Sequence, residues 1–333
     1  MQRLPYVVVT NPHLTHVYEL YYKAFETFRK QKEIKTIDDN EKYCRVVSDM
    51  LKEHLIVIPN LALGVLECQH LVAPELMDTF MNGMLRAHLA LTETFNSPWH
   101  FEQPTHESEF VGEVLLRCKA KEVIEDCGKA AQDLCRHIEG NKCPIPQINI
   151  RGHTEATFPY ILSQLEYIIG ELLRNSVQAL MAKYEASKTE PPPIDVLICE
   201  APQHVIIRIS DQGGGIPRDI VPYLWSFTKG PRRGTRMTNW QKVPSMAATN
   251  EELMVNLKGT QNKRDDSLST LSSRPPDLRL GMGLPMSRVY AEYWAGALEL
   301  HSLEGHGVDA FLTISKLGNQ NEQLSTRESI DSV

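Results

Sequence analysis

The sequence predicts an all-α helical bundle over residues 1–139, followed by an α+β domain over residues 140–318. Long segments with apolar residues at three- and four-residue spacing fill the first part, which contains no run typical of a strand. After about Gly140, short β-rich runs alternate with helical segments. The length of 333 residues fits two domains, and 42% hydrophobic with 23% charged residues is an ordinary globular composition.

Four helices are predicted in the first part. The first begins near Leu14, and the second follows Asp39, which we expect to cap its N-terminus. The third covers about residues 73–94 and is opened by Pro74, a residue suited to the first helical turn. The fourth covers about residues 120–138, where apolar residues again recur on one stripe.

Strands and helices alternate in the second part. In chain order we predict extended runs at 146–153 and 158–162, a helix at 165–186, strands at 194–201 and 204–213, a helix at 286–296, and a strand, turn and strand over 297–317. Gly296 is expected as the residue just beyond the end of the last helix. Residues 229–278 have little periodicity, as in a functional or unstructured loop, and residues 319–333 form a polar tail.

Composition excludes several classes of protein. The net charge is −7 and no long Lys/Arg block exists, which argues against nucleic acid as a partner. No membrane span is predicted, since the longest apolar run, near Leu55 to Leu66, is interrupted by Pro59 and Asn60. The seven cysteines form no C-x-x-C pair, which favours a reducing compartment with buried thiols. Cys127 and Cys135 lie at helical spacing among apolar residues and are expected in the core.

The first segment that could carry chemistry is Glu171-Leu-Leu-Arg-Asn175 on the predicted helix 165–186. Glu171 and Asn175 are four residues apart and therefore share a face. A carboxylate and an amide oxygen on one face can hold hydrated Mg²⁺ and orient an attacking hydroxyl. Alone, the pattern also fits a solvated polar face.

The second segment is Asp211-Gln-Gly-Gly-Gly215, directly after a β-rich run. A carboxylate at a strand end can accept a hydrogen bond from an exocyclic amine, and the glycines let the backbone approach a flat ring or phosphates. A simple glycine-rich turn is the other interpretation.

The third segment is Gly281-Met-Gly283-Leu-Pro at the start of a predicted helix. Glycines before a helix N-terminus present unpaired N–H groups and the positive end of the helix dipole to an anion. A single G-x-G before a helix is a weak signal by itself.

Taken in order, these segments resemble the GHKL (Bergerat-type) ATP-binding fold of histidine kinases, chaperone ATPases and type II topoisomerases. Longer stretches, including "ISDQGGGIP", "RGHTEATFPYILSQLEYIIGELLRNSVQAL" and "GLPMSRVYAEYWAGALELHSLEGHGVDA", resemble the mitochondrial α-ketoacid dehydrogenase kinases. The helical first half fits the same family with "LPYVVVTNPHLTHVYELYYKAF". The resemblance covers residues 3 to 318.

The resemblance implies roles for individual residues. Glu171 matches the general base, Asn175 the Mg²⁺ ligand and Asp211 the adenine-binding carboxylate. Residues 229–278 match the ATP lid. The remaining expected nucleotide-site residues are Arg174, Gln178, Gly213, Gly215, Thr228, Lys229, Arg279, Gly281, Met282, Gly283 and Leu284.

The function implied is ATP- and Mg²⁺-dependent phosphorylation of a serine on the decarboxylase component of an α-ketoacid dehydrogenase complex, which inactivates that component. The implied partners are this component and the lipoyl-domain core of the complex. A homodimer, or a heterodimer with a paralogue, is also implied. The implied location is the mitochondrial matrix, although no transit peptide is recognised within this sequence.

Pyruvate dehydrogenase is the preferred substrate, because that complex is the more widespread target. A branched-chain α-ketoacid dehydrogenase kinase is the alternative. It is favoured by Tyr167, where pyruvate dehydrogenase kinases typically carry His, and by a tail without their Asp-Trp motif. A nucleotide-binding pseudokinase or regulatory subunit, and a clamp-type ATPase, are further alternatives.

Four departures from the family pattern bear on these alternatives. Arg279 stands where relatives have a glycine, and Val308 where they have Thr. The helix around Leu85 to His88 is about ten residues short by comparison with the family, and the family's first helix is absent. The last two differences favour a truncated or mis-spliced gene model over evolved specialisation.

Overall fold

A computed structural model describes residues 4–31, 33–54, 56–96, 110–111, 114–139, 145–184, 189–229 and 281–316. Within these ranges the chain forms two compact units, which are described separately. Unit 1 contains residues 4–96, 226–229 and Gly281, and unit 2 contains residues 110–225 and 282–316. The predicted lid beyond Lys229, Arg279 and the tail lie outside the described residues.

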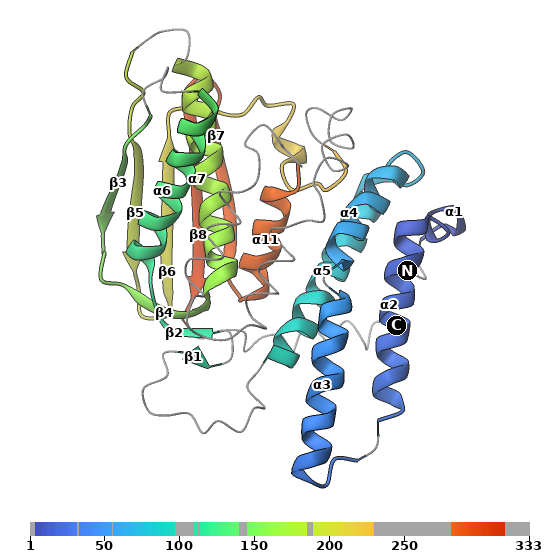
Figure 1. The fold of residues 1–333 in the computed structure, drawn as a ribbon. Helices are drawn as coiled ribbons and strands as arrows, with labels where there is room; N and C mark the ends of the chain where they lie inside the picture. Colours follow the sequence, from blue (N-terminus) through green and yellow to red (C-terminus); the bar gives the residue numbers. More distant parts are fainter. Residues whose placement is uncertain are drawn as a thin grey trace. The chain divides into compact units, whose positions relative to one another are not determined.

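Unit 1 is helical, as predicted for the first part of the chain (Figure 1). Its helices are α1 (Tyr6–Val9), α2 (Pro12–Arg29), α3 (Ile37–His54), α4 (Val57–Cys68) and α5 (Pro74–Asn96). Helix α4 was not predicted. Its Pro59 lies in the first turn, where a missing N–H costs nothing, so the proline does not interrupt the helix.

The expected cap at Asp39 is wrong. Helix α3 starts at Ile37, three residues earlier than predicted, and the capping side chain is that of Thr36, whose hydroxyl accepts from the Asp39 N–H at 3.1 Å. The Asp39 carboxylate accepts in turn from the Thr36 N–H at 3.1 Å. This is a reciprocal capping box, with Asp39 inside the first turn.

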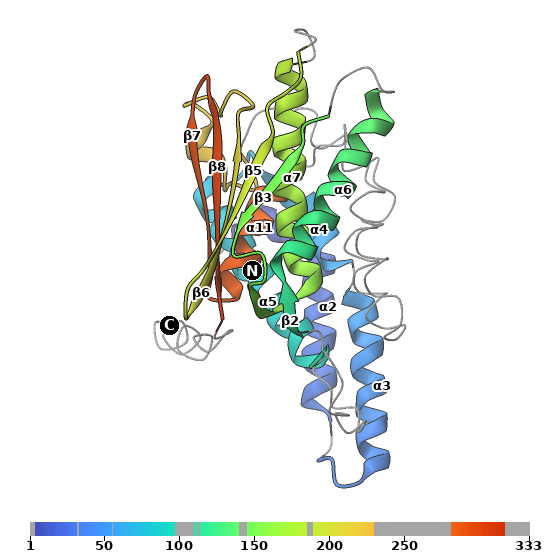
Figure 2. The same ribbon diagram turned by 90° about the vertical axis from the view of Figure 1, so that its left-hand side faces the viewer.

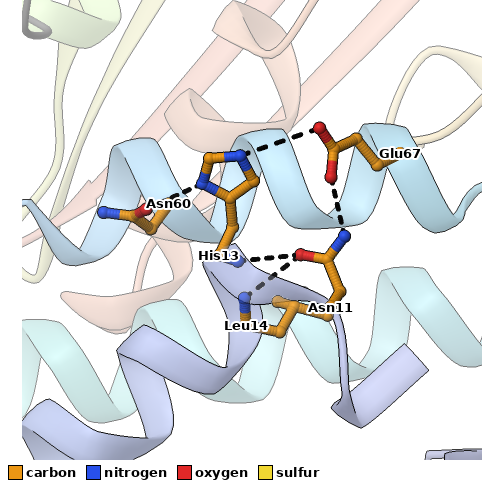
Figure 3. Close-up of polar contacts among 5 residues, drawn as sticks. All are labelled: Asn11, His13, Leu14, Asn60 and Glu67. Carbon is orange, nitrogen blue, oxygen red and sulfur yellow. Dashed lines mark hydrogen bonds and ion pairs between the residues drawn. The ribbon is translucent and has the colours of Figure 1, made fainter. Parts of the chain in front are cut away.

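A polar network joins the start of α2 to α4 (Figure 3). The side-chain oxygen Oδ1 of Asn11 caps α2 by accepting from the N–H groups of His13 and Leu14, and its side-chain NH₂ group donates to Glu67 at 2.7 Å. The His13 ring lies between Asn60, at 2.9 Å, and Glu67, at 3.7 Å. The network therefore fixes the N-terminal end of α2 against α4.

Three aromatic side chains with titratable groups lie in the interior of unit 1. The rings of His54 and His88 stack in parallel with centroids 6.4 Å apart, and the Tyr21 hydroxyl lies 3.4 Å from His88 Nδ1. Burial lowers the pKa of His88 to about 4, and the neighbouring His54 acts in the same direction. Burial also lowers the pKa of His54. The bundle therefore holds both rings in the neutral form at pH 7.

Unit 2 is built on a five-stranded mixed sheet in the order β3-β5-β6-β8-β7. The strands are β3 (Ile148–Gly152), β5 (Ile194–Glu200), β6 (His204–Asp211), β7 (Ala297–Leu303) and β8 (Gly307–Ser315). β3 pairs with β5 in parallel, and the other pairs are antiparallel. These strands were all predicted from the sequence.

Helices α6 (Ala120–Glu139), α7 (Leu162–Tyr184) and α11 (Gly283–Tyr293) lie on one face of this sheet (Figure 2). α7 packs on β6, α11 packs on β7 and β8, and α6 packs against α7. A second, small antiparallel sheet joins β1 (Phe110–Val111), β2 (Val114–Lys119) and β4 (Thr157–Ile161). A 3₁₀ turn, η1 (Val221–Tyr223), completes the unit.

The compact units do not follow the predicted boundary between residues 139 and 140. The helix predicted as the fourth member of the bundle is α6, which packs on α7 in unit 2. The apolar stripe of α6 packs on α7, a helix of the sheet domain. A helix of a bundle would have the same stripe, so periodicity alone could not identify the element on which α6 packs. The two short strands β1 and β2 were also missed.

The expected role of Gly296 at the end of α11 is wrong. The left-handed residue is Ala295, with φ +53°. Gly296 is required for a different reason, because a Cβ there would lie 2.2 Å from the Thr313 carbonyl oxygen. The glycine therefore permits a close approach to β8.

Buried thiols were predicted correctly for Cys68, Cys118 and Cys127, which are free and buried. Cys199 is exposed on β5. The side chain of Cys135 lies outside the described residues. Across the described part of the chain, no helix combines the length and apolar character needed to cross a membrane.

Acidification should destabilise unit 1. The unfolded chain protonates His88 near pH 6.5 but the folded chain only near pH 4, so the stability that the neutral ring contributes is complete above 6.5 and is lost as the pH falls towards 4. Between pH 7 and pH 5 the loss is about 2 kcal/mol. Thermal unfolding at these two pH values measures it. His88→Asn should lose less stability than wild type over the same interval, and equal losses would contradict the assignment.

Candidate functional site

Asp211 ends β6, and its carboxylate is buried with 7% of the residue exposed. One oxygen accepts from the Ser176 hydroxyl of α7 at 2.9 Å, and the other accepts from the Gly213 N–H at 2.8 Å. Burial raises the pKa of Asp211, whereas the hydrogen bonds from Gly213, Ser176 and the Val308 backbone oppose that rise. The carboxylate is therefore held in one orientation by three different elements.

The glycines after Asp211 are required by close contacts. A Cβ on Gly213 would lie 2.5 Å from the Cβ of Ala179 on α7, so this turn packs directly on the helix. Gly215 has φ +74°, and a Cβ there would lie 2.3 Å from the Leu303 carbonyl oxygen of β7. These glycines are therefore required for packing of the turn on α7 and β7, and the predicted approach of this backbone to a ring or phosphates stays a prediction.

The β7–β8 hairpin closes on the same turn. The Gly214 N–H donates to the His306 carbonyl, and the Gly305 N–H donates to the Gly214 carbonyl at 2.7 Å. Gly307 lies opposite the end of β6, where a Cβ would be 1.9 Å from the Asp211 carbonyl oxygen. The turn and the hairpin therefore form one hydrogen-bonded unit.

Lys183, near the end of α7, ties the helix to this unit. Its ammonium donates to the Gln212 carbonyl at 2.8 Å and lies 3.5 Å from the His306 carbonyl. Lys183 and Ser176 were both missed by the sequence analysis. The one indication in the sequence was the position of Ser176 next to Asn175 on the predicted helix, because that position turns its side chain towards the buried side of the helix.

Glu171 and Asn175 lie on α7, as predicted, but in different environments. Glu171 is 2% exposed and pairs with Arg174 at 3.0 Å, whereas Asn175 is exposed. Glu171 is therefore not on a solvated polar face, which removes the alternative interpretation for that residue. Gln178 is half-buried one turn further along.

The glycine-rich segment starts α11 as predicted. Gly281 has φ +73°, Met282 is the N-cap residue and makes no side-chain cap, and Gly283 and Leu284 form the first turn. A Cβ on Gly283 would lie 2.1 Å from Glu171 Oε2. The start of α11 and the Glu171 carboxylate are thus in direct contact.

Thr228 and Lys229 belong to unit 1. The Thr228 hydroxyl lies 3.2 Å from the Ser226 hydroxyl, and the Lys229 ammonium lies 3.7 Å from Glu75 of α5. Their predicted nucleotide contact stays a prediction.

The arrangement in unit 2 fits an adenine nucleotide with a divalent cation. The Asp211 carboxylate retains acceptor capacity for an exocyclic amine, and the uncapped first N–H groups of α11 suit phosphate oxygens. The Nε of Arg174 is buried without a hydrogen-bond partner among the described residues, so it is a further donor for an anion. Asn175 offers an exposed amide oxygen, a ligand type that Mg²⁺ accepts.

Comparison with known proteins gives two matching family models. Residues 1–115 match a family described as mitochondrial branched-chain alpha-ketoacid dehydrogenase kinase. Residues 161–317 match histidine kinase-, DNA gyrase B- and HSP90-like ATPases.

Several proteins similar over most of the chain are named as pyruvate dehydrogenase kinases. The mitochondrial [pyruvate dehydrogenase (acetyl-transferring)] kinase 2 of Saccharomyces cerevisiae is 30% identical, over 97% of this chain and 74% of its own. The mitochondrial enzyme of Arabidopsis thaliana is 27% identical, over 97% of this chain and 81% of its own. Human isozyme 4 is 23% identical, over 86% of this chain and 65% of its own.

Gly213→Ala should weaken adenine-nucleotide binding by about tenfold or more, because the added Cβ would displace the turn from α7 and move the Asp211 carboxylate. Titration with a fluorescent adenine nucleotide measures the affinity. Gly83→Ala on α5 is the matched control, since its Cβ would meet nothing within 4 Å. Unchanged affinity in a folded Gly213→Ala protein would contradict the assignment.

Proposed function

The chain belongs to the mitochondrial pyruvate dehydrogenase kinase family, and we propose on this premise that it transfers phosphate from ATP to a serine of the pyruvate dehydrogenase decarboxylase component. It is an ATP-dependent protein kinase. The observation that carries the proposal is the pairing of whole-chain similarity with the site in unit 2. There the α7 face, the end of β6 and the start of α11 come together around Asp211 and Glu171.

Nucleotide recognition is assigned to groups that the fold already holds in place. The Asp211 carboxylate accepts the adenine amine, and Gly213 and Gly215 allow the close packing of the turn that holds this carboxylate in place. The first turn of α11 binds phosphate oxygens through its N–H groups. Asn175 is the proposed Mg²⁺ ligand, and the bound cation would neutralise charge on the phosphates.

Glu171 is the proposed general base. Its carboxylate accepts the proton of the attacking serine hydroxyl, while the serine oxygen takes the γ-phosphoryl group and ADP is the leaving group. Its contact with Gly283 supports this role, because the base lies beside the loop proposed to hold the phosphates. The Glu171 carboxylate and the backbone at the start of α11 are thus close enough to act on the same serine hydroxyl.

The partners follow from the family. A dehydrogenase complex is the target, with the decarboxylase component as the phosphate acceptor and the lipoyl-domain core as the proposed docking platform. The relatives are named as mitochondrial, which supports a mitochondrial location, and we place the protein in the matrix. The predicted lid at 229–278 is proposed to cover the bound nucleotide.

Glu171→Gln should lower phosphate transfer by about 10²- to 10⁴-fold, because the amide cannot accept the serine proton. The assay incubates labelled MgATP with purified pyruvate or branched-chain decarboxylase component, each with its lipoyl-bearing core. We expect labelling of the pyruvate component. Glu125→Gln, on the exposed side of α6, is the control and should be fully active.

Preferential labelling of the branched-chain component would replace the proposed substrate. ATP binding without labelling of either component would instead support the pseudokinase alternative.

We also propose that the open face of the five-stranded sheet forms a homodimer. The helices of unit 2 cover the other face (Figure 2), and the open face carries Ile206, Leu197 and Phe311. Arg208 pairs with Asp309 at 3.1 Å and lies over the Phe311 ring, which leaves a mixed apolar and charged surface. Such a surface can be buried against a second copy of itself.

Phe311→Glu should convert the dimer to a monomer, because a carboxylate would be buried at the centre of that face. Sedimentation velocity measures the change. Leu116→Glu, at an exposed position of β2, is the matched control and should stay dimeric. A dimeric Phe311→Glu protein would contradict this interface.

A further inference from the structure

The ion pair between Glu171 and Arg174 is unusually protected from solvent. The side chains are 3% and 12% exposed, and the guanidinium lies 3.0 Å from Glu171 Oε2. Arg136 and Asp133 form a pair of the same spacing on α6, but those side chains are 52% and 56% exposed. A pair removed from water is screened far less, so the Glu171–Arg174 pair has an energetic effect that the exposed pair lacks.

Arg174 has donor capacity that the protein does not use. Its Nε is buried and has no hydrogen-bond partner among the described residues. A guanidinium carries five N–H donors, and a buried donor without an acceptor is costly. The arrangement therefore suits a second anion that the described part of the chain does not supply.

The place where such an anion would bind is next to Glu171. Gly283 touches the Glu171 carboxylate, and it opens α11, whose first N–H groups have no side-chain cap. An anion at this helix start would repel the Glu171 carboxylate and attract the same guanidinium. Glu171 and the anion therefore compete for Arg174.

We propose that Arg174 is a positioning residue that holds Glu171 in the nucleotide-free protein and exchanges it for the phosphates when MgATP binds. This inference rests on the proposed function, since it takes the anion to be the phosphate chain of ATP and Glu171 to be the base. Arg174 suits the exchange because its planar fork binds carboxylate and phosphate equally well. The consequence is that the base becomes available to the serine only when the phosphoryl donor is in place.

The exchange makes a prediction about ATP affinity that does not depend on phosphate transfer. Part of the binding free energy of MgATP is used to break the Glu171–Arg174 pair. Removing the Glu171 charge should therefore tighten MgATP binding, and the tightening should be larger while Arg174 is present. The measurement is a double-mutant cycle on the MgATP dissociation constant, by calorimetry, with wild type, Glu171→Gln, Arg174→Gln and the double variant.

Glu171→Gln should bind MgATP about three- to tenfold more tightly than wild type, as expected for residues in direct contact. In the Arg174→Gln background the same change should tighten binding clearly less, because only the relief of charge repulsion remains. Arg174→Lys keeps the positive charge and should retain part of the coupling between positions 171 and 174. It replaces Arg174→Gln in the cycle if that variant does not fold. Arg136→Gln is the control and should leave the full effect of Glu171→Gln intact.

Equal tightening by Glu171→Gln with and without Arg174 would overturn the exchange, because simple relief of charge repulsion would then explain it. Absence of tightening in both backgrounds would also overturn it. Failure of the wild-type protein to bind MgATP would overturn the proposed function together with this inference. The two failures are therefore distinguishable.

Discussion

The buried carboxylate of Asp211 is the constraint on which the rest of unit 2 depends. A carboxylate removed from water must be hydrogen-bonded, and Ser176 from α7, Gly213 from the following turn and the Val308 backbone from β8 supply those bonds. Around this carboxylate, the turn meets α7 and β8 meets the end of β6 at two positions where a Cβ would clash. The glycines at 213 and 307 are thus requirements of packing as well as of ligand access.

Helix α7 connects this constraint to the chemistry. Ser176 holds Asp211, and Glu171 lies about one turn earlier on the same helix against the start of α11. Because one rigid helix carries both, the distance between the proposed adenine-binding carboxylate and the proposed base is set by helix geometry rather than by a loop. Lys183 adds a further constraint, because its ammonium group bonds the end of α7 to the glycine turn and to the β7–β8 hairpin.

The sequence predicted those elements whose pattern of apolar residues fits only one kind of secondary structure and packing. Strand β6 alternates between buried and more exposed residues along its length, and most residues of α7 are buried, so both elements were predicted correctly. Where a pattern has more than one structural solution, the prediction failed. The stripe of α6 fits a bundle as well as a sheet domain, and Pro59 fits a helix start as well as a break. The proposed site rests on Asp211, Glu171 and the glycines, which lie in sequence motifs, whereas Ser176 and Lys183 belong to no motif and join the site only through tertiary contacts.

The most direct test of this account is a crystal structure of the protein with MgADP or a non-hydrolysable MgATP analogue. We expect the adenine amine within hydrogen-bond distance of the Asp211 carboxylate and the metal on Asn175. The phosphates should lie at the start of α11, with Arg174 turned from Glu171 towards them. A nucleotide bound elsewhere, or one that leaves the Asp211 carboxylate bonded only to Ser176, Gly213 and Val308, would contradict the account.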